Sequence, residues 1–138
     1  MCGGGYTHTV GGSCYAYVDK PESWFDAQSL CRATGGFLAE IQNVQQNDLM
    51  KKLLSDNKAS SHIWLGGDDL FQEGKWFWAH SGIPVDDFTD WHAGQPDDAN
   101  SGENCMQLHS SWKQWNDGDC DIKVPFVCQK LMTSEVIG

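Results

Sequence analysis

Six cysteines constrain this chain more than any other feature of its 138-residue sequence. Their number is even and no two form a Cys-x-x-Cys pair, while the five histidines fall at no zinc-ligand spacing. Disulfides are therefore a better interpretation than a zinc site, although spacing alone leaves fifteen pairings open. Disulfides form in oxidising compartments, so the sequence predicts a secreted, extracellular protein. The cysteines are Cys2, Cys14, Cys31, Cys105, Cys120 and Cys128.

Size and charge narrow the class of partner. The chain is long enough for one domain with a buried core and too short for two ordinary domains. Nine basic residues against nineteen acidic ones give a formal net charge of −10. This balance disfavours nucleic acid and anionic membrane surfaces and favours cations or neutral partners. No stretch approaches the ~18 apolar residues of a membrane span.

The first third of the chain predicts a hairpin followed by a helix. Residues 13–18 are rich in β-branched and aromatic side chains, which is typical of a strand. Ser23 is a candidate N-cap for a helix, and Gly35 and Gly36 predict where that helix ends. Its buried face is expected to consist of Trp24, Ala27, Leu30 and Cys31.

A second helix is predicted over residues 43–56, with Asn43 as its cap and a periodic apolar stripe of Leu49, Met50, Leu53 and Leu54. This stripe is expected to pack in the core. Strands are predicted over residues 63–67, 75–79, 105–108 and 124–129. Helices first and a strand-rich, loop-rich half afterwards indicate an α+β domain.

Oxygen-bearing side chains are concentrated between residues 91 and 120. A hard cation such as Ca²⁺ takes about six to eight oxygen ligands from carboxylates, amides, carbonyls and water, and this stretch offers many. A solvated acidic turn explains the same composition, so both interpretations stay open at this point. The residues concerned are Gln95, Asp97, Asp98, Asn100, Glu103, Asn104, Asn116, Asp117 and Asp119.

Three short motifs in this stretch resemble the sugar-binding calcium site of C-type lectins. They are Gln95-Pro96-Asp97, Glu103-Asn104-Cys105 and Trp115-Asn116-Asp117, and residues 38–41, 63–67 and 126–128 resemble strands of the same family. The resemblance covers residues 2–130 as one long-form carbohydrate-recognition domain and leaves residues 131–138 as a short tail. It implies the C-type lectin fold, with two helices, antiparallel sheets and a long calcium-binding loop region. It also implies the pairings Cys2–Cys14, Cys31–Cys128 and Cys105–Cys120.

The resemblance further implies two calcium sites. The principal ion would be held by Gln95, Asp97, Glu103, Asn116 and Asp117, in the family usually next to a cis peptide before Pro96. A second ion is implied at Asp69, Glu73, Asp98 and Asn104, where Asn104 departs from the Asp often found in the family. The alternative for this second group is a solvated turn around Asp69 and Glu73.

In the family, Gln-Pro-Asp accompanies galactose-type sugars, so the resemblance implies galactose or N-acetylgalactosamine as the preferred ligand. A mannose-type or broad specificity, or a protein ligand, is the alternative. Trp112 and His109 are candidates for stacking on the sugar, with core burial as the alternative for Trp112. The predicted sugar-binding residues are Gln95, Asp97, Glu103, Asn116, Trp112 and His109.

No Ser-His-Asp or Cys-His arrangement stands out, so an enzyme is not expected. A free-standing lectin of this kind is expected to serve agglutination or innate recognition, for which several sites in a homo-oligomer would be useful.

Overall fold

Ten elements are formed by the residues that the computed structural model describes, which are 2–58, 61–96 and 102–132. The strands join in one sheet in the order β1-β2-β8-β4-β6-β7, with β3 beside β8 and β5 beside β4. The helices are α1 (Trp24–Ala33) and α2 (Val44–Asp56). The strands are β1 (His8–Val10), β2 (Ser13–Glu22), β3 (Phe37–Leu38), β4 (Ile63–Asp68), β5 (Phe77–Trp78), β6 (Glu103–Leu108), β7 (Trp115–Asp119) and β8 (Val124–Leu131).

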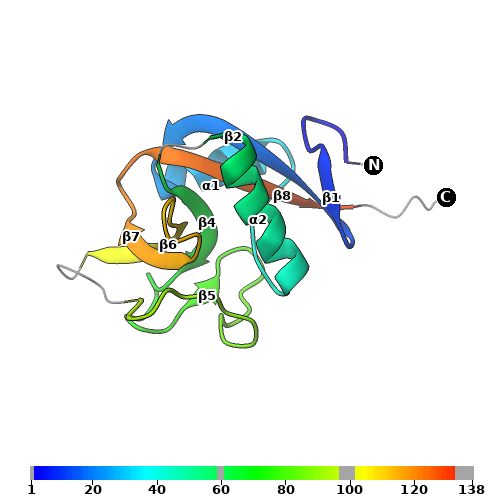
Figure 1. The fold of residues 1–138 in the computed structure, drawn as a ribbon. Coiled ribbons are helices and arrows are strands. Elements are labelled where there is room, and N and C mark those ends of the chain that lie inside the picture. The colour runs from blue at the N-terminus through cyan, green and yellow to red at the C-terminus, as the bar shows by residue number, and fades with distance from the viewer. Residues whose placement is uncertain (1, 59–60, 97–101, 133–138) are drawn as a thin grey trace.

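The predicted α+β class is confirmed, with one feature that the prediction of antiparallel sheets did not contain. All strand pairs are antiparallel except β4 and β8, which run parallel and meet at Trp64 and Phe126. Figure 1 shows the hairpin of β1 and β2 at one end of the molecule and β6 and β7 at the other. The sheet therefore carries the oxygen-rich segment at the end opposite to the N-terminal hairpin.

Helix α1 begins and ends where the sequence predicts. The Ser23 hydroxyl accepts a hydrogen bond from the Asp26 N–H at 3.2 Å, which satisfies one of the free donors of the first turn. The expectation that Leu30 lies on the buried face is wrong. Leu30 is 37 % exposed and lines an open hollow of about 440 Å³ with Tyr17 and Val18. Gln28 is buried instead, because its Oε1 accepts the Leu38 N–H at 2.8 Å.

Helix α2 also matches the prediction. Asn43 caps it through a hydrogen bond from the Gln46 N–H to Asn43 Oδ1 at 2.9 Å. The predicted apolar stripe is buried in full. Asn47, one turn before that stripe, is also buried although it is polar. Its side-chain contacts belong to the candidate site described below.

The sheet separates two hydrophobic cores, one packed on each helix. Ile63 and Leu65 of β4 belong to the core under α2, whereas Trp64 between them belongs to the core under α1. Val127 and Phe126 of β8 divide in the same way. This alternation follows from the two-residue period of a strand, so a sheet covered on both faces reads as a continuous apolar run.

All three predicted disulfides are confirmed. Cys31–Cys128 joins α1 to the central strand β8, and Cys2–Cys14 closes the N-terminal hairpin. Cys105–Cys120 joins β6 to the residue that follows β7. None of the cysteines is left free. In the part of the chain that the structure describes, no helix is long and apolar enough to cross a membrane.

Two strands differ from the prediction. The strand expected over residues 75–79 is reduced to β5, Phe77–Trp78. The strand β7, Trp115–Asp119, was not predicted. Asn, Asp and Gly are poor strand formers, so the local sequence disfavours β7, and its pairing with β6 along five residue positions overrides that preference.

Candidate functional site

The hairpin of β6 and β7 carries three of the five predicted principal ligands. Asn116 and Asp117 lie on β7, and Glu103 is the first residue of β6. In the register of the two strands, Glu103 lies opposite Asp119, two residues from Asp117. The Cys105–Cys120 disulfide joins β6 to the residue directly after β7. These three oxygen-bearing side chains are therefore held on adjacent strands with a covalent link beside them.

The fourth predicted ligand, Gln95, reaches this hairpin through its backbone. The His92 N–H donates to the Trp115 carbonyl at 2.9 Å, and the Trp115 N–H donates to the Asp90 carbonyl at 2.9 Å. The Gln95 N–H then donates to the His92 carbonyl at 2.8 Å, and the Gln95–Pro96 peptide is cis. Gln95 is thus tied to the strand that carries Asn116. The predicted ligands Asp97 and Asp98 lie outside the described residues.

The donor set at Asn116 and Asp117 fits a hard cation. The Asn116 Nδ2 donates to the Asp117 carbonyl at 3.0 Å, while Asn116 Oδ1 is buried and no donor among the described residues reaches it. A buried oxygen without a donor is costly, and a cation would satisfy it. Asp117 is only 1 % exposed, and a buried carboxylate needs hydrogen bonds, an ion pair or a metal. Amide and carboxylate oxygens are the ligands that Ca²⁺ prefers.

The structure brings together three of the four residues predicted for a second ion. Asp69 is almost fully buried, its N–H donates to the Asn104 carbonyl at 3.1 Å, and its Oδ2 accepts the Gly74 N–H at 2.9 Å. In the amide orientation that satisfies its neighbours, Asn104 Nδ2 donates to Glu73 Oε1 at 2.9 Å and to Asp69 Oδ1 at 3.0 Å. An amide N–H₂ thus lies between the two carboxylates. No group of three or more His, Cys, Asp or Glu residues suited to a metal occurs in the described ranges.

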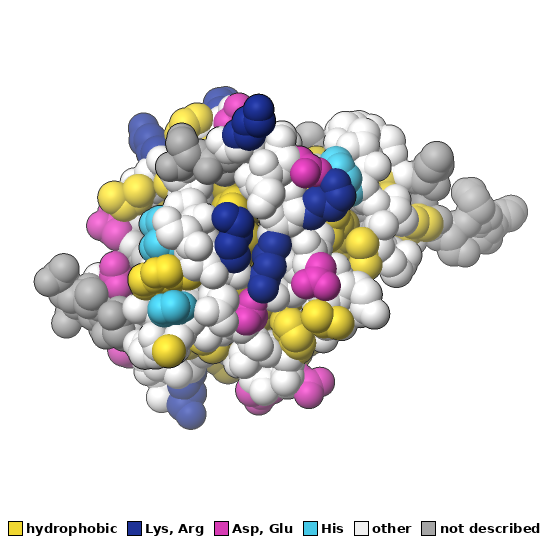
Figure 2. Space-filling view, in the orientation of Figure 1, with side chains coloured by type: hydrophobic (Ala, Val, Ile, Leu, Met, Phe, Trp, Pro, Cys, Tyr) yellow, Lys and Arg dark blue, Asp and Glu magenta, His cyan; other side chains and the backbone are white. Residues whose placement is uncertain are grey.

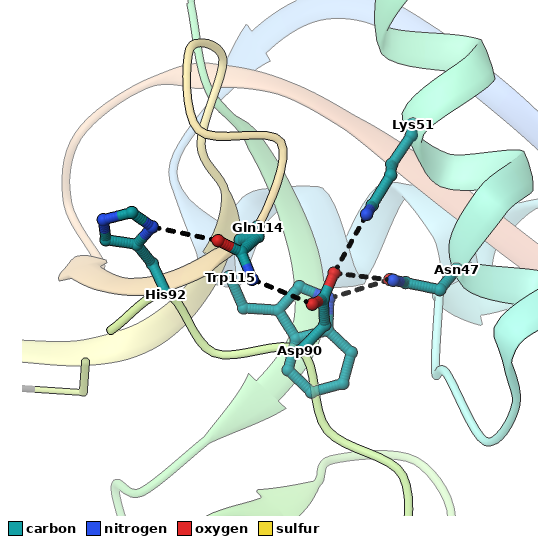
Figure 3. A network of polar contacts seen from close by, with 6 residues as sticks. All are labelled: Asn47, Lys51, Asp90, His92, Gln114 and Trp115. Carbon is teal, nitrogen blue, oxygen red and sulfur yellow. Dashed lines mark hydrogen bonds and ion pairs between the residues drawn. The ribbon is translucent and has the colours of Figure 1, made fainter. Parts of the chain in front are cut away.

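A polar network behind the hairpin was not predicted from the sequence (Figure 3). Asp90 Oδ2 accepts from Asn47 Nδ2 at 2.8 Å and lies 3.2 Å from Lys51 Nζ, so two residues of α2 hold it. Asp90 Oδ1 accepts from Gln114 Nε2 at 3.1 Å, and Gln114 Oε1 lies 3.0 Å from His92 Nδ1. The only signal in the sequence was Asn47, a polar residue in line with the apolar stripe of α2.

Trp112 and three histidines form a column of rings beside β6 and β7. The His109 and His92 rings stack on Trp112 at centroid distances of 3.7 and 4.0 Å and interplanar angles of 10° and 12°. His62 continues the column at 4.1 Å from His109. Figure 2 shows histidine and hydrophobic side chains together on this side of the molecule. We infer that two rings so close and so parallel lie on opposite faces of the indole, because they would clash on one face.

This packing bears on the predicted stacking role of Trp112. The side chain is 40 % exposed, so it is not a core residue. Both of its faces are covered by histidines, and its exposed edge remains for a ligand. His109 is fixed as well, because its Nδ1 accepts the N–H groups of Ser111 and Trp112, each at 3.2 Å.

Burial and neighbouring groups shift two histidine pKa values in the column. Burial lowers the pKa of His62, whose Nδ1 accepts the Ser110 N–H at 3.0 Å. Burial and, after it, the charges that His62 and His92 carry when protonated lower the pKa of His109. Both rings are therefore held in the neutral form, in which Nδ1 is an acceptor.

The chain is similar to proteins of one known family. Residues 20–130 match the family described as Lectin C-type domain. The galactose-specific lectin nattectin of Thalassophryne nattereri is 32 % identical over 133 residues, which cover 94 % of this chain and 80 % of the relative.

Two solved structures show how widely the fold is used. The carbohydrate-recognition domain of the mouse scavenger receptor C-type lectin superposes with a TM-score of 0.82 at 32 % identity, covering 91 % of this chain and 95 % of that one. A calcium-independent type II antifreeze protein superposes with a TM-score of 0.83 at 28 % identity, covering 96 % of each chain. The fold alone therefore does not decide whether calcium is bound, and the site residues must.

Proposed function

The chain belongs to the C-type lectin domain family and has its fold, and from this premise we propose that it binds carbohydrate through calcium. The observation that carries the proposal is the buried Asn116 Oδ1, which no donor among the described residues reaches, next to the buried Asp117 carboxylate. A cation bound there would satisfy the Asn116 oxygen, and the neighbouring carboxylate is a ligand type that calcium prefers. We propose Gln95, Asp97, Glu103, Asn116 and Asp117 as its ligands.

In this proposal, a bound calcium would supply a Lewis-acidic centre with positions for two neighbouring sugar hydroxyls. The protein's side chains then read the remaining hydrogen-bonding capacity of those hydroxyls. Gln95 has an N–H₂ donor besides its oxygen, whereas Asp97 and Glu103 accept only. The donor and acceptor sides of the site are therefore unlike, which allows it to distinguish the orientation of a hydroxyl pair.

We propose galactose or N-acetylgalactosamine as the preferred sugar. The Gln95-Pro96-Asp97 motif supports this choice, and so does the 32 % identity to nattectin, which is described as galactose-specific. His109 and the exposed edge of Trp112 are proposed as additional contacts beside the ion. Because both faces of Trp112 are covered, the preference for galactose is expected to be modest. A mannose-type or broad specificity is the alternative that the test below distinguishes.

The second predicted ion is a weaker proposal. In the amide orientation that satisfies its neighbours, Asn104 Nδ2 donates to Asp69 and Glu73, so an amide compensates these carboxylates. A calcium ion would bind there only after the Asn104 amide turned its oxygen inward. We therefore propose one tightly bound calcium and a second, weak one.

A domain that binds a protein or another surface without calcium is the competing function, because a calcium-independent antifreeze protein shares the fold. The complete set of principal ligand types favours the calcium-dependent lectin. The three disulfides favour a secreted protein, since such bonds persist outside the cytosol. Agglutination or innate recognition is the proposed use, and it would require a homo-oligomer or several sites on one particle.

A glycan array with the purified protein, run with calcium and with EDTA, tests this proposal. Galactose-terminated glycans should bind in calcium only, and Glu103→Gln should abolish this binding because it removes a charged ligand without changing the side chain's size. Asp86→Asn is the matched control, since Asp86 is exposed and lies outside the proposed ligand set. Binding that persists in EDTA would refute the calcium mechanism, and an array without any bound glycan in calcium would favour the protein-binding alternative.

A further inference from the structure

We propose that Asp90 is a positioning residue that holds the two halves of the proposed calcium site in register. The first half is the segment 91–95, which leads to Gln95. The second is the start of β7, which carries Asn116 and Asp117. This inference rests on the proposed function, because it assigns Asp90 a role in the affinity for calcium.

The Asp90 carboxylate joins three parts of the chain that are far apart in the sequence. Its Oδ2 receives Asn47 Nδ2 at 2.8 Å and Lys51 Nζ at 3.2 Å from α2, and its Oδ1 receives Gln114 Nε2 at 3.1 Å from the residue before β7. Figure 3 shows these donors converging on the one carboxylate. The side chain is 20 % exposed, so solvent screens these contacts only partly.

Backbone hydrogen bonds next to Asp90 also fix the segment 91–95 relative to β7. The Asp90 carbonyl accepts the Trp115 N–H, and the Trp115 carbonyl accepts the His92 N–H, each at 2.9 Å. Trp91 and Trp115 form an isolated parallel bridge. Asn116 follows Trp115 directly, and Gln95 is bonded to the His92 carbonyl. A shift of Asp90 relative to β7 would therefore move Gln95 relative to Asn116.

Helix α2 anchors Asp90 and Trp115 to the buried core through Asn47. Asn47 is 2 % exposed, and while its Nδ2 donates to Asp90, its Oδ1 accepts the indole N–H of Trp115 at 3.0 Å. Trp115 is fully buried and meets Trp78, Phe88 and Trp91 edge to face. Metal ligands need the support of groups behind them to keep their geometry, and Asp90 connects this rigid core to both ligand segments.

Gln114→Glu is the most informative variant, because its introduced carboxylate would face the Asp90 carboxylate and has no donor to offer. A positioning role predicts that the dissociation constant for calcium, measured by calorimetric titration, rises about tenfold. An effect of charge alone would lower the dissociation constant, since an added negative charge near the site should tighten the binding of a cation. Gln45→Glu, which places the same change on the exposed face of α2, should leave the affinity unchanged.

The rescue variant combines Gln114→Glu with Asp90→Asn. The amide N–H₂ introduced at position 90 then donates to the carboxylate introduced at position 114, while its oxygen still accepts from Asn47 and Lys51. The net charge equals that of the unmodified protein. The dissociation constant should return to within about twofold of the unmodified value, although the second substitution removes a negative charge. If the double variant binds calcium more weakly than Gln114→Glu alone, charge and not register governs the affinity and the inference is overturned.

Amide hydrogen exchange in EDTA separates this inference from the proposed function. The peptides that contain residues 91–96 and 115–119 should lose protection in Gln114→Glu and regain it in the double variant. If the unmodified protein binds no calcium, the proposed function fails. If it binds calcium and Gln114→Glu has unchanged affinity and exchange, only the role of Asp90 is overturned.

Discussion

Two asparagines of the candidate site turn their amides in opposite ways. Asn116 turns its Nδ2 to the Asp117 carbonyl and leaves its buried Oδ1 available for a cation. Asn104 instead directs its Nδ2 to the carboxylates of Asp69 and Glu73 in the amide orientation that satisfies its neighbours. An amide can act either as a ligand or as a substitute for a cation, and its hydrogen-bonding neighbours decide which.

Asn104→Asp should convert the second group of carboxylates into a stronger calcium site. Without calcium the substitution removes two N–H donors and adds a third negative charge, so the melting temperature in EDTA should fall by several degrees, on the order of 4–8 °C. With calcium a second ion should bind, and calorimetric titration should report a stoichiometry near two. A stoichiometry of one, together with a melting temperature that stays lowered at high calcium, would contradict a second site.

The exchange of Gln95→Glu with Asp97→Asn should change the sugar preference. The pair keeps one carboxylate and one amide at the ion but reverses which side donates a hydrogen bond. Galactose-type hydroxyl pairs should then lose their match and mannose-type pairs should gain one, with a shift of about tenfold or more. Competition by free galactose and free mannose at saturating calcium measures it. An unchanged ranking would mean that contacts such as His109 and Trp112 set the specificity.

Among the elements, the connection between β6 and β7 has an unusual internal support. It contains two backbone N–H groups that donate to His109 Nδ1, and a third that donates to His62 Nδ1. Protonation of either Nδ1 would place an N–H against another N–H. The support of this connection thus depends on neutral His62 and His109.

Stability should therefore decrease as the pH falls below the ordinary histidine pKa of 6.5. A lowered folded-state pKa means that the unfolded chain binds the proton first, so the stability present above pH 6.5 is lost on acidification. Burial raises the pKa of Glu40 and Asp68, which acts in the opposite direction at lower pH. Thermal unfolding in EDTA at pH 7.5 and 5.5 should show a smaller loss for His62→Asn, whose amide oxygen still accepts the Ser110 N–H. An equal loss in both proteins would exclude His62 as the source.

At the scale of the whole molecule, one disulfide encloses nearly the entire domain. Cys31–Cys128 spans 97 residues and joins α1 to the strand that lies between the two cores, whereas Cys105–Cys120 spans 15 residues beside the site. Chain-entropy arguments assign about 4–5 kcal/mol to the first and about 3 kcal/mol to the second. The first value is close to the lower end of the free energy of unfolding of a typical domain, which is about 5–15 kcal/mol.

Removing each bridge by a pair of Cys→Ala substitutions should give different results. Loss of Cys31–Cys128 should leave the chain largely unfolded at 37 °C, as seen by circular dichroism. Loss of Cys105–Cys120 should leave a folded protein with weaker calcium affinity, because the strands that carry Glu103 and Asp117 would be held together less firmly. The model of two separate roles is contradicted if the second variant unfolds first or keeps full calcium affinity.

The sequence by itself determined the helices, the disulfides and the class of the fold. Caps such as Ser23 and Asn43 and the apolar stripe of α2 are local signals, and the cysteine pairing followed from the motifs that resemble the family. The grouping of Gln95, Glu103, Asn116 and Asp117 as ligands of one ion came from the same motifs and stays a prediction.

Only the tertiary structure decided which polar groups meet. Strand β7 has an unfavourable local sequence and forms because β6 pairs with it. Asp90, Asn47 and Gln114 come together from three segments, the Asn104 amide faces two carboxylates, and Trp112 stacks with two histidine rings while its edge stays exposed. No local pattern encodes these contacts, because each depends on the packing of elements distant in the chain, and periodicity and spacing describe only neighbours along it.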